Sequence, residues 1–134
     1  MAKKEETMRT RLVLVCLVLA ILVSSAPVIR AADTTVLRVI TVQTDDVDGY
    51  LKELENARAI NKRLQGTGVI RAWRARFAGD AAGAIVVSIE YPSLMAMARD
   101  EEKAQADPEE KALLARLGKM RKIVSDSLYN ELKP

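Results

Sequence analysis

Apolar residues recur along the chain with two different spacings, one typical of strands and the other of helices. Residues 35–44 (TVLRVITVQT) are rich in β-branched side chains and predict a first strand. From Val47 to Leu64, apolar residues recur every three or four positions, which indicates one face of an amphipathic helix. We expect Asp45 to cap this helix and Gly66 to end it, because these residue types favour the two helix ends.

The stretch GVIRAWRARF, residues 68–77, predicts a second strand with two distinct faces. One face carries Val69, Arg71, Trp73, Ala75 and Phe77, and the other carries Ile70, Ala72, Arg74 and Arg76. Small residues at 78–83 predict a turn. Residues 84–91 (AIVVSIEY) predict a third strand, with Ser88 and Glu90 opposite its apolar face.

Two further helix starts follow the third strand. Pro92 ends that strand, and Ser93 is expected to cap a helix that runs to about residue 105. The stretch DPEE, residues 107–110, combines an aspartate cap, a proline at the first helical position and Glu110 in the capping-box position. Leucines 113, 114 and 117 form the apolar face of the helix that follows. Residues 123–132 predict a final strand.

The predicted order β-α-β-β-α(α)-β indicates an α+β, ferredoxin-like fold. Its antiparallel sheet carries the helices on one face. The opposite face is left uncovered, so we expect two copies of the chain to pack sheet against sheet.

The first residues of the chain have the pattern of an export signal. A basic start is followed by an unbroken apolar run, residues 12–23, and then by small residues. Cleavage after Ala31 would give a signal peptide at 1–31 and one domain at 32–134. The apolar run is short for a spanning helix, which needs roughly 20 apolar residues. An uncleaved anchor in the inner membrane is the alternative to a periplasmic or secreted protein.

Removing the signal changes the charge balance. The chain has 21 Lys and Arg and 18 Asp and Glu. Residues 1–32 hold five of these cations and two of the anions, which leaves 16 of each in the domain. A neutral domain lacks the clustered positive charge that nucleic-acid binding needs, so we expect no nucleic-acid partner.

The composition also excludes several kinds of chemistry. The chain has no histidine, and its one cysteine, Cys16, lies inside the signal. Histidine-dependent triads, thiolate nucleophiles and cysteine-bound zinc are therefore excluded from the domain. The stretch TDDVD, residues 44–48, lacks the ligand spacing of a calcium loop and fits helix capping instead. We expect no metal and no cofactor.

The stretches VLRVITVQ, WRARFAG and AGAIVVSIEYPSLMAMARDEEKAQADPEEKALLARL resemble the dimeric α/β-barrel superfamily. Small proteins akin to the antibiotic-biosynthesis-monooxygenase and NIPSNAP groups have this pattern over residues 35–132. The resemblance implies a homodimer whose two sheets close into a barrel. Some members oxidise or rearrange small aromatic molecules without a cofactor, some degrade haem, and many have no assigned activity.

The resemblance transfers no catalytic residue to this chain. Haem-degrading members use a histidine ligand, which is absent here. Cofactor-free oxygenases of the superfamily use Asn, Trp, Tyr or His around a pocket. Asn61, Trp73 and Tyr91 are the available residues of these types, but their spacing matches no family motif.

The candidate pocket residues are Arg71, Trp73, Arg74, Glu90 and Tyr91. In this interpretation Trp73 forms an aromatic wall, Arg71 or Arg74 binds a carboxylate or phosphate, and Glu90 acts as a base if burial raises its pKa. The alternative is structural: Trp73 fills an interface, and the arginines pair with Glu90 and other carboxylates on the sheet surface.

The expected function is that of an exported, non-catalytic homodimer that binds a small apolar or anionic molecule or associates with partners. The alternative is a cofactor-independent monooxygenase or isomerase that acts on a small aromatic compound. A membrane-tethered form of the first is a third interpretation. The absence of histidine and cysteine from the domain favours the non-catalytic homodimer. The residues leave open whether the chain is an enzyme.

Overall fold

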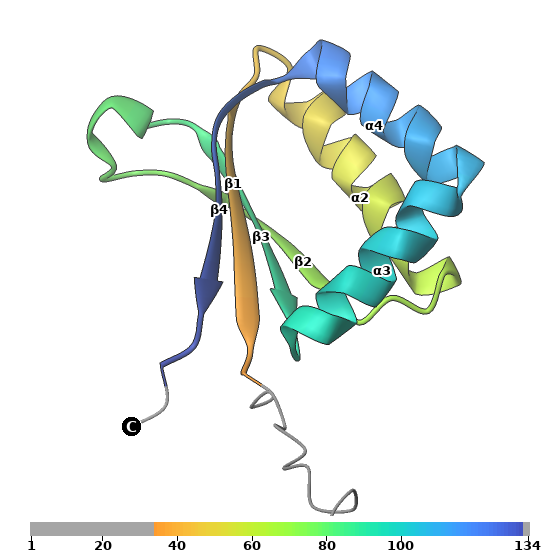
Figure 1. The fold of residues 1–134 in the computed structure, drawn as a ribbon. Coiled ribbons are helices and arrows are strands. Elements are labelled where there is room, and N and C mark those ends of the chain that lie inside the picture. Colours follow the sequence, from red (N-terminus) through yellow and green to blue (C-terminus); the bar gives the residue numbers. More distant parts are fainter. Residues whose placement is uncertain (1–33, 133–134) are drawn as a thin grey trace, which may run out of the picture. The chain divides into compact units, whose positions relative to one another are not determined.

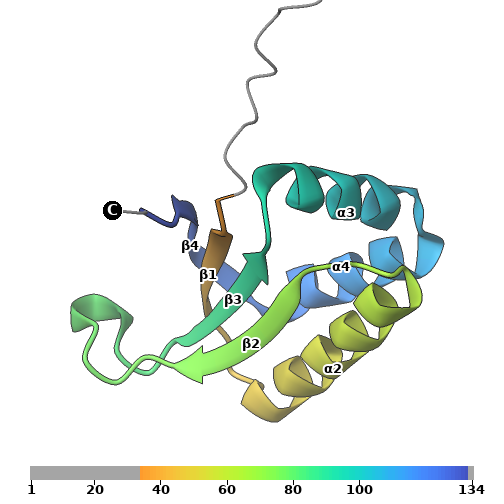
Figure 2. The same ribbon diagram turned by 90° about the horizontal axis from the view of Figure 1, so that it is seen from below.

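A four-stranded antiparallel sheet carries three helices on one side in the computed structural model, which describes residues 34–132 (Figures 1 and 2). The sheet order is β2-β3-β1-β4. The elements in chain order are β1 (Val36–Gln43), α2 (Val47–Arg63), β2 (Val69–Arg74), the 3₁₀ turn η2 (Gly79–Ala81), β3 (Ile85–Tyr91), α3 (Leu94–Ala106), α4 (Pro108–Met120) and β4 (Lys122–Asn130). The predicted ferredoxin-like fold is confirmed. The predicted signal peptide lies outside the described residues.

The first strand is one of the two central strands, since it pairs with a neighbour on each edge as β3 does. It pairs with β3 from Val36 opposite Tyr91 to Val42 opposite Ile85, and with β4 along its other edge. The register with β4 shifts between Thr41 and Val42. These pairings place alternate residues of all four strands on the helix side.

The core lies between that side of the sheet and the helices. Its buried members come from β1, β3, α2 and α4, since their apolar positions follow the strand and helix periods. They are Ile40, Val42, Tyr50, Leu54, Ile60, Ile85, Val87, Leu113 and Leu117. Burial of each such side chain contributes about 1.5–3 kcal/mol to folding.

Both ends of α2 differ by one residue from the prediction. The cap is Asp46 rather than Asp45, and its Oδ1 accepts from the amide of Gly49 at 2.9 Å. At the other end, Gln65 rather than Gly66 takes the left-handed conformation, with φ of 54°. The amides of Gln65 and Gly66 donate to the carbonyls of Lys62 and Asn61, as in a Schellman motif.

Gly66 is needed for space. A Cβ at this position would run into the side chain of Asn61. That side chain is fixed, because its Nδ2 donates to the carbonyl of Gly68 at 2.8 Å. The glycine thus lets α2 end close to the start of β2.

Asp107 both ends α3 and begins α4. Its amide donates to the carbonyl of Ala104 at 3.1 Å, which closes α3. Its Oδ1 accepts from the amides of Glu109 and Glu110, which caps α4. The predicted start of α4 at the DPEE stretch is confirmed, and so is the Ser93 cap of α3, whose Oγ accepts from the amide of Ala96.

The other side of the sheet is left uncovered within residues 34–132. The register places there Val69, Arg71 and Trp73 of β2, Val86, Ser88 and Glu90 of β3, Leu37, Val39 and Thr41 of β1, and Ser125, Ser127 and Tyr129 of β4. We call this surface the open face. Trp73 is 55% exposed on it, and its Nε1 donates to the Oγ of Ser88 at 2.8 Å.

Candidate functional site

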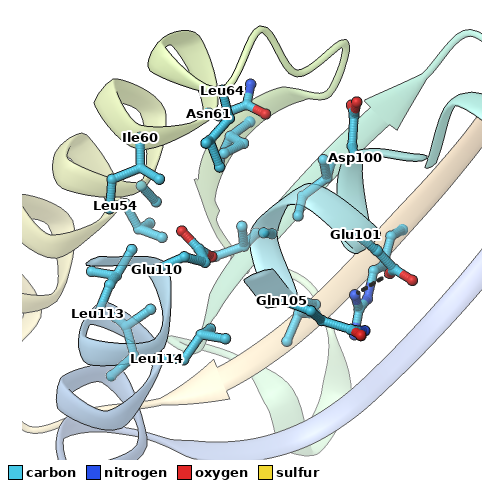
Figure 3. Close-up of a pocket in the computed structure, with 18 of the residues that line it drawn as sticks. Leu54, Ile60, Asn61, Leu64, Asp100, Glu101, Gln105, Glu110, Leu113 and Leu114 are labelled. Atoms are coloured by element: carbon cyan, nitrogen blue, oxygen red, sulfur yellow. Dashed lines mark hydrogen bonds and ion pairs between the residues drawn. The ribbon is translucent and has the colours of Figure 1, made fainter. Parts of the chain in front are cut away.

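A pocket of about 450 Å³ lies between the sheet and the three helices (Figure 3). Its volume falls within the range of pockets that hold small organic molecules. Its lining from the sheet and α2 is Arg38, Ile40, Ile70, Val87, Ile89 and Tyr91, with Leu54, Ala57, Ile60, Asn61 and Leu64. The lining from α3, α4 and the following residue is Asp100, Glu101, Ala104, Gln105, Glu110, Leu113, Leu114, Leu117 and Arg121.

The apolar wall of the pocket follows from helix periodicity. On α2, the lining residues Leu54, Ala57, Asn61 and Leu64 are three or four positions apart and therefore share one face. The leucines of α4 follow the same rule. Strand residues such as Ile40 complete this wall from the sheet. A ligand would thus meet mainly leucine and isoleucine side chains.

Three of the polar side chains that line the pocket lie on α3: Asp100, Glu101 and Gln105. Asp100 is buried, and its Oδ2 accepts from the amide of Thr67 at 2.6 Å, from the Thr67 hydroxyl at 2.8 Å and from the amide of Gly68 at 3.2 Å. This carboxylate joins α3 to the loop between α2 and β2. Its role is therefore structural.

Arg38 and Glu101 form a second fixed pair at the pocket. Arg38 Nη1 contacts Glu101 Oε1 at 3.1 Å, which Figure 3 shows as a dashed contact. The same guanidinium binds both oxygens of Asp126, at 3.0 and 2.7 Å. These bonds raise the pKa of Arg38 and lower that of Asp126. The charges of this pair are satisfied within the protein.

Glu110 differs from the other two carboxylates of the pocket. Figure 3 shows its carboxyl group in the space among α2, α3 and α4. Within residues 34–132 this group has no hydrogen-bond or ion-pair partner. Burial, and to a lesser degree the neighbouring charge of Asp107, raise the pKa of Glu110. The pocket therefore holds an acidic group that is free to bind a ligand.

Arg121 lines the pocket where α4 ends. Its Nη1 donates to the hydroxyl of Tyr50 at 2.9 Å, and its guanidinium lies 5.8 Å from the centre of that ring. Its Nε is buried and has no partner within the described part of the chain.

The candidate residues predicted from the sequence lie at two separate places. Tyr91 lines the pocket, and burial, as the main cause, raises its pKa. Arg71, Trp73 and Glu90 lie on the open face, away from the pocket lining. There Arg71 and Glu90 form an ion pair of 3.0 Å. Arg74 is exposed at the end of β2 and also lies outside the lining.

Several pocket residues were not singled out as site candidates from the sequence. Asp100, Glu101 and Arg38 carry no local motif, and the sheet and helices join them only in three dimensions. Glu110 was assigned to a capping box, in which its carboxylate would accept from the amide of Asp107. That amide already donates to Ala104. The prediction for Glu110 was therefore wrong, and its side chain turns to the pocket.

Two further properties concern residues 34–132 only. Acidic residues there form no group of three that could hold a metal ion. No helix in this part of the chain has the length and hydropathy needed to cross a membrane.

The element order, the sheet order and the pocket between sheet and helices define a ferredoxin-like α+β protein. No family model and no curated protein matches the chain. Solved structures do match it. A NIPSNAP family protein from Agrobacterium tumefaciens has a TM-score of 0.57 at 19% identity, over 75% of this chain and 85% of that one.

Two other structures show the same similarity. SnoaB, a cofactor-independent oxygenase from Streptomyces nogalater, has a TM-score of 0.57 at 14% identity, over 75% of this chain and 96% of SnoaB. An uncharacterized NIPSNAP domain protein from Burkholderia xenovorans has a TM-score of 0.56 at 16% identity. This similarity covers 75% of this chain and 94% of that protein. At these identities the similarity establishes the fold alone, and the ferredoxin-like fold of the single chain that the resemblance implied is confirmed.

Proposed function

We propose that this chain is an exported, homodimeric protein that binds a small, largely apolar molecule between its sheet and helices. The observation that carries this proposal is the 450 Å³ pocket with its leucine- and isoleucine-rich wall. Pockets of this size and lining bind small molecules by burying most of their surface, while a few polar groups set the orientation.

The pocket can be filled by a substitution to test this proposal. Ala104 is half-buried on α3 and lines the pocket, so the ring of Ala104→Phe would occupy the space of a ligand. We expect this variant to bind the neutral probe naphthylmethanol at least about tenfold more weakly than the wild type. Isothermal titration calorimetry measures both affinities.

The matched control is Ala98→Phe. Ala98 lies on the same helix but is exposed and outside the pocket lining. This variant should bind the probe as the wild type does. Equal affinity in all three proteins, with circular dichroism showing that each is folded, would place the probe elsewhere and refute the proposed pocket.

Export and homodimer formation are supported by different features. The N-terminal pattern of charged, apolar and small residues supports cleavage after Ala31. The open face supports a homodimer because Trp73, Val69 and Tyr129 leave about half of their surfaces exposed there. Native mass spectrometry of the exported protein tests both: we expect a mass twice that of residues 32–134. An uncleaved monomer would contradict both parts.

Cofactor-independent oxygenation is a second candidate function. It is favoured by the raised pKa of Glu110 inside an apolar pocket, since a general base works best when its pKa lies near the working pH. The shared fold of the oxygenase SnoaB adds to this candidate. Oxygen uptake with a hydroxylated polycyclic aromatic compound tests it. Uptake that requires the compound and is lost in Glu110→Gln would favour the enzyme over a binding protein.

A further inference from the structure

We propose that the ligand of this pocket is a small lipophilic amine, whose ammonium group pairs with the carboxylate of Glu110. Its apolar part would lie among the leucine and isoleucine side chains. This inference rests on the small-molecule-binding function proposed above and specifies the chemistry of the ligand.

The helix junction explains why Glu110 is available. In a capping box, the third helical residue accepts from the backbone amide of the cap residue. Here the cap residue, Asp107, donates that amide to Ala104 of the preceding helix. Because α3 and α4 share Asp107, the usual partner of Glu110 is already occupied. Its carboxylate is left in the pocket instead.

The other two carboxylates of the pocket are satisfied by the protein itself. Asp100 accepts three hydrogen bonds from Thr67 and Gly68. Arg38 binds Glu101 and also Asp126, which lies outside the lining. Of the three carboxylates that line the pocket, Glu110 alone has no such partner within residues 34–132. Among the carboxylates of the pocket, Glu110 therefore carries the unpaired negative charge.

The charge of Arg63 lowers the pKa of Glu110, but by less than burial and the charge of Asp107 raise it. Arg63 approaches the junction from α2, but it binds both oxygens of Asp107 and also Glu109. Arg121 lines the pocket just beyond the far end of α4, and at 1.5 Å per residue its backbone lies about 16 Å from that of Glu110 along the helix axis. A positively charged group on the ligand itself would compensate the carboxylate of Glu110.

A cationic ligand also accounts for the apolar surroundings of Glu110. Glu110 is half-buried in a pocket with a largely apolar lining, and partial burial is costly for an isolated carboxylate. An ammonium group would satisfy the carboxylate with a charge-assisted hydrogen bond, while the apolar lining would bury the apolar part of the amine. An anion would meet repulsion from Glu110, and a neutral alcohol would gain only an ordinary hydrogen bond.

Three probes with the same ring system distinguish a cationic, a neutral and an anionic ligand: naphthylmethylamine, naphthylmethanol and naphthoate. Their affinities are measured by isothermal titration calorimetry near neutral pH, on protein purified after expression of the full chain. We expect the amine to bind about tenfold to a hundredfold more tightly than the alcohol, and naphthoate to bind most weakly. This comparison needs no variant.

The assignment to Glu110 is tested with Glu110→Gln. This variant should bind the amine and the alcohol with affinities within about threefold of each other. Glu102→Gln is the matched control, because Glu102 is exposed on α3 outside the pocket lining. It should keep the full preference for the amine.

Each other outcome has a distinct meaning. Equal binding of amine and alcohol by the wild type would overturn the amine proposal and leave the small-molecule function intact. A preference for the amine that persists in Glu110→Gln would overturn the role of Glu110. Failure of all three probes to bind would overturn the proposed function itself.

Discussion

Asp107 connects three elements, α3 through its backbone amide and both α4 and α2 through its carboxylate. It caps α4, it ends α3, and it pairs with Arg63 of α2 through two contacts of 2.9 and 3.0 Å. The Arg63 guanidinium, followed by the amide of Glu110, lowers the pKa of Asp107 to about 2. The packing of α2 against α3 and α4 thus depends on Asp107, the charged residue that joins these two helices.

This lowered pKa predicts a pH dependence of stability. Because the folded state holds the Asp107 pKa below its ordinary value of 3.8, its stabilisation is present above about pH 4 and lost as the pH falls through about 2. Asp107→Asn keeps a capping oxygen but cannot titrate. We expect the thermal midpoint of the wild type to fall more steeply than that of the variant over this interval.

Circular dichroism melts at a series of pH values measure this difference. Asp80→Asn, at an exposed position in η2, is the control and should follow the wild type. Parallel curves for wild type and Asp107→Asn would contradict the role assigned to the Arg63–Asp107 pair.

At the scale of one element, the end of α2 carries a residue whose backbone conformation favours glycine. Gln65 has φ of 54°, in the left-handed region that costs a non-glycine residue about 1 kcal/mol. We expect Gln65→Gly to raise the free energy of unfolding by about 0.5–1 kcal/mol, as measured by urea denaturation. Gly66→Ala should lower it instead, since the added Cβ meets Asn61. Destabilisation by Gln65→Gly would contradict this account.

The order and type of the elements follow from the sequence, and the reason is local. Apolar residues alternate with polar ones in residues 84–91 and recur every three or four positions after Val47. These two spacings indicate which face of the strand and of the helix is buried. The helix caps were predicted less well. Asp45 and Asp46 are the same residue type side by side, so only backbone geometry decides which one caps. Gly66 was predicted to end α2, and it is the close approach of Asn61 that requires a glycine there.

The site was predicted much less completely than the fold, because its residues meet only in the folded chain. Tyr91 is the one predicted candidate that lines the pocket. The aromatic and arginine content of residues 68–77 drew attention to β2, yet the alternation places Arg71 and Trp73 on the open face. No sequence motif marks Glu110 as a pocket residue. Its carboxylate is unpaired because the amide of Asp107, the residue shared by α3 and α4, donates to Ala104 instead.

For the whole molecule, the open face predicts the effect of Trp73→Ala. In the single chain this indole is 55% exposed, so its removal should change the stability of the monomer little. In a dimer closed through this face it would be buried, and its loss should cost about 3 kcal/mol or more of association free energy. Analytical ultracentrifugation over a range of concentrations measures the dissociation constant.

Met95→Ala serves as the control for this measurement. Met95 is an exposed hydrophobic residue of α3, on the helix side of the sheet. Its removal should leave association unchanged. Equal dissociation constants for wild type and Trp73→Ala would show that the open face is not the dimer contact.

Trp73 is the only tryptophan of the chain, and its position on the open face makes it a reporter for one side of the sheet. Its fluorescence should shift to shorter wavelength when a second subunit excludes water from the indole. A molecule that enters the pocket on the opposite side of the sheet leaves that environment unchanged. One emission spectrum therefore distinguishes self-association from ligand uptake without a label.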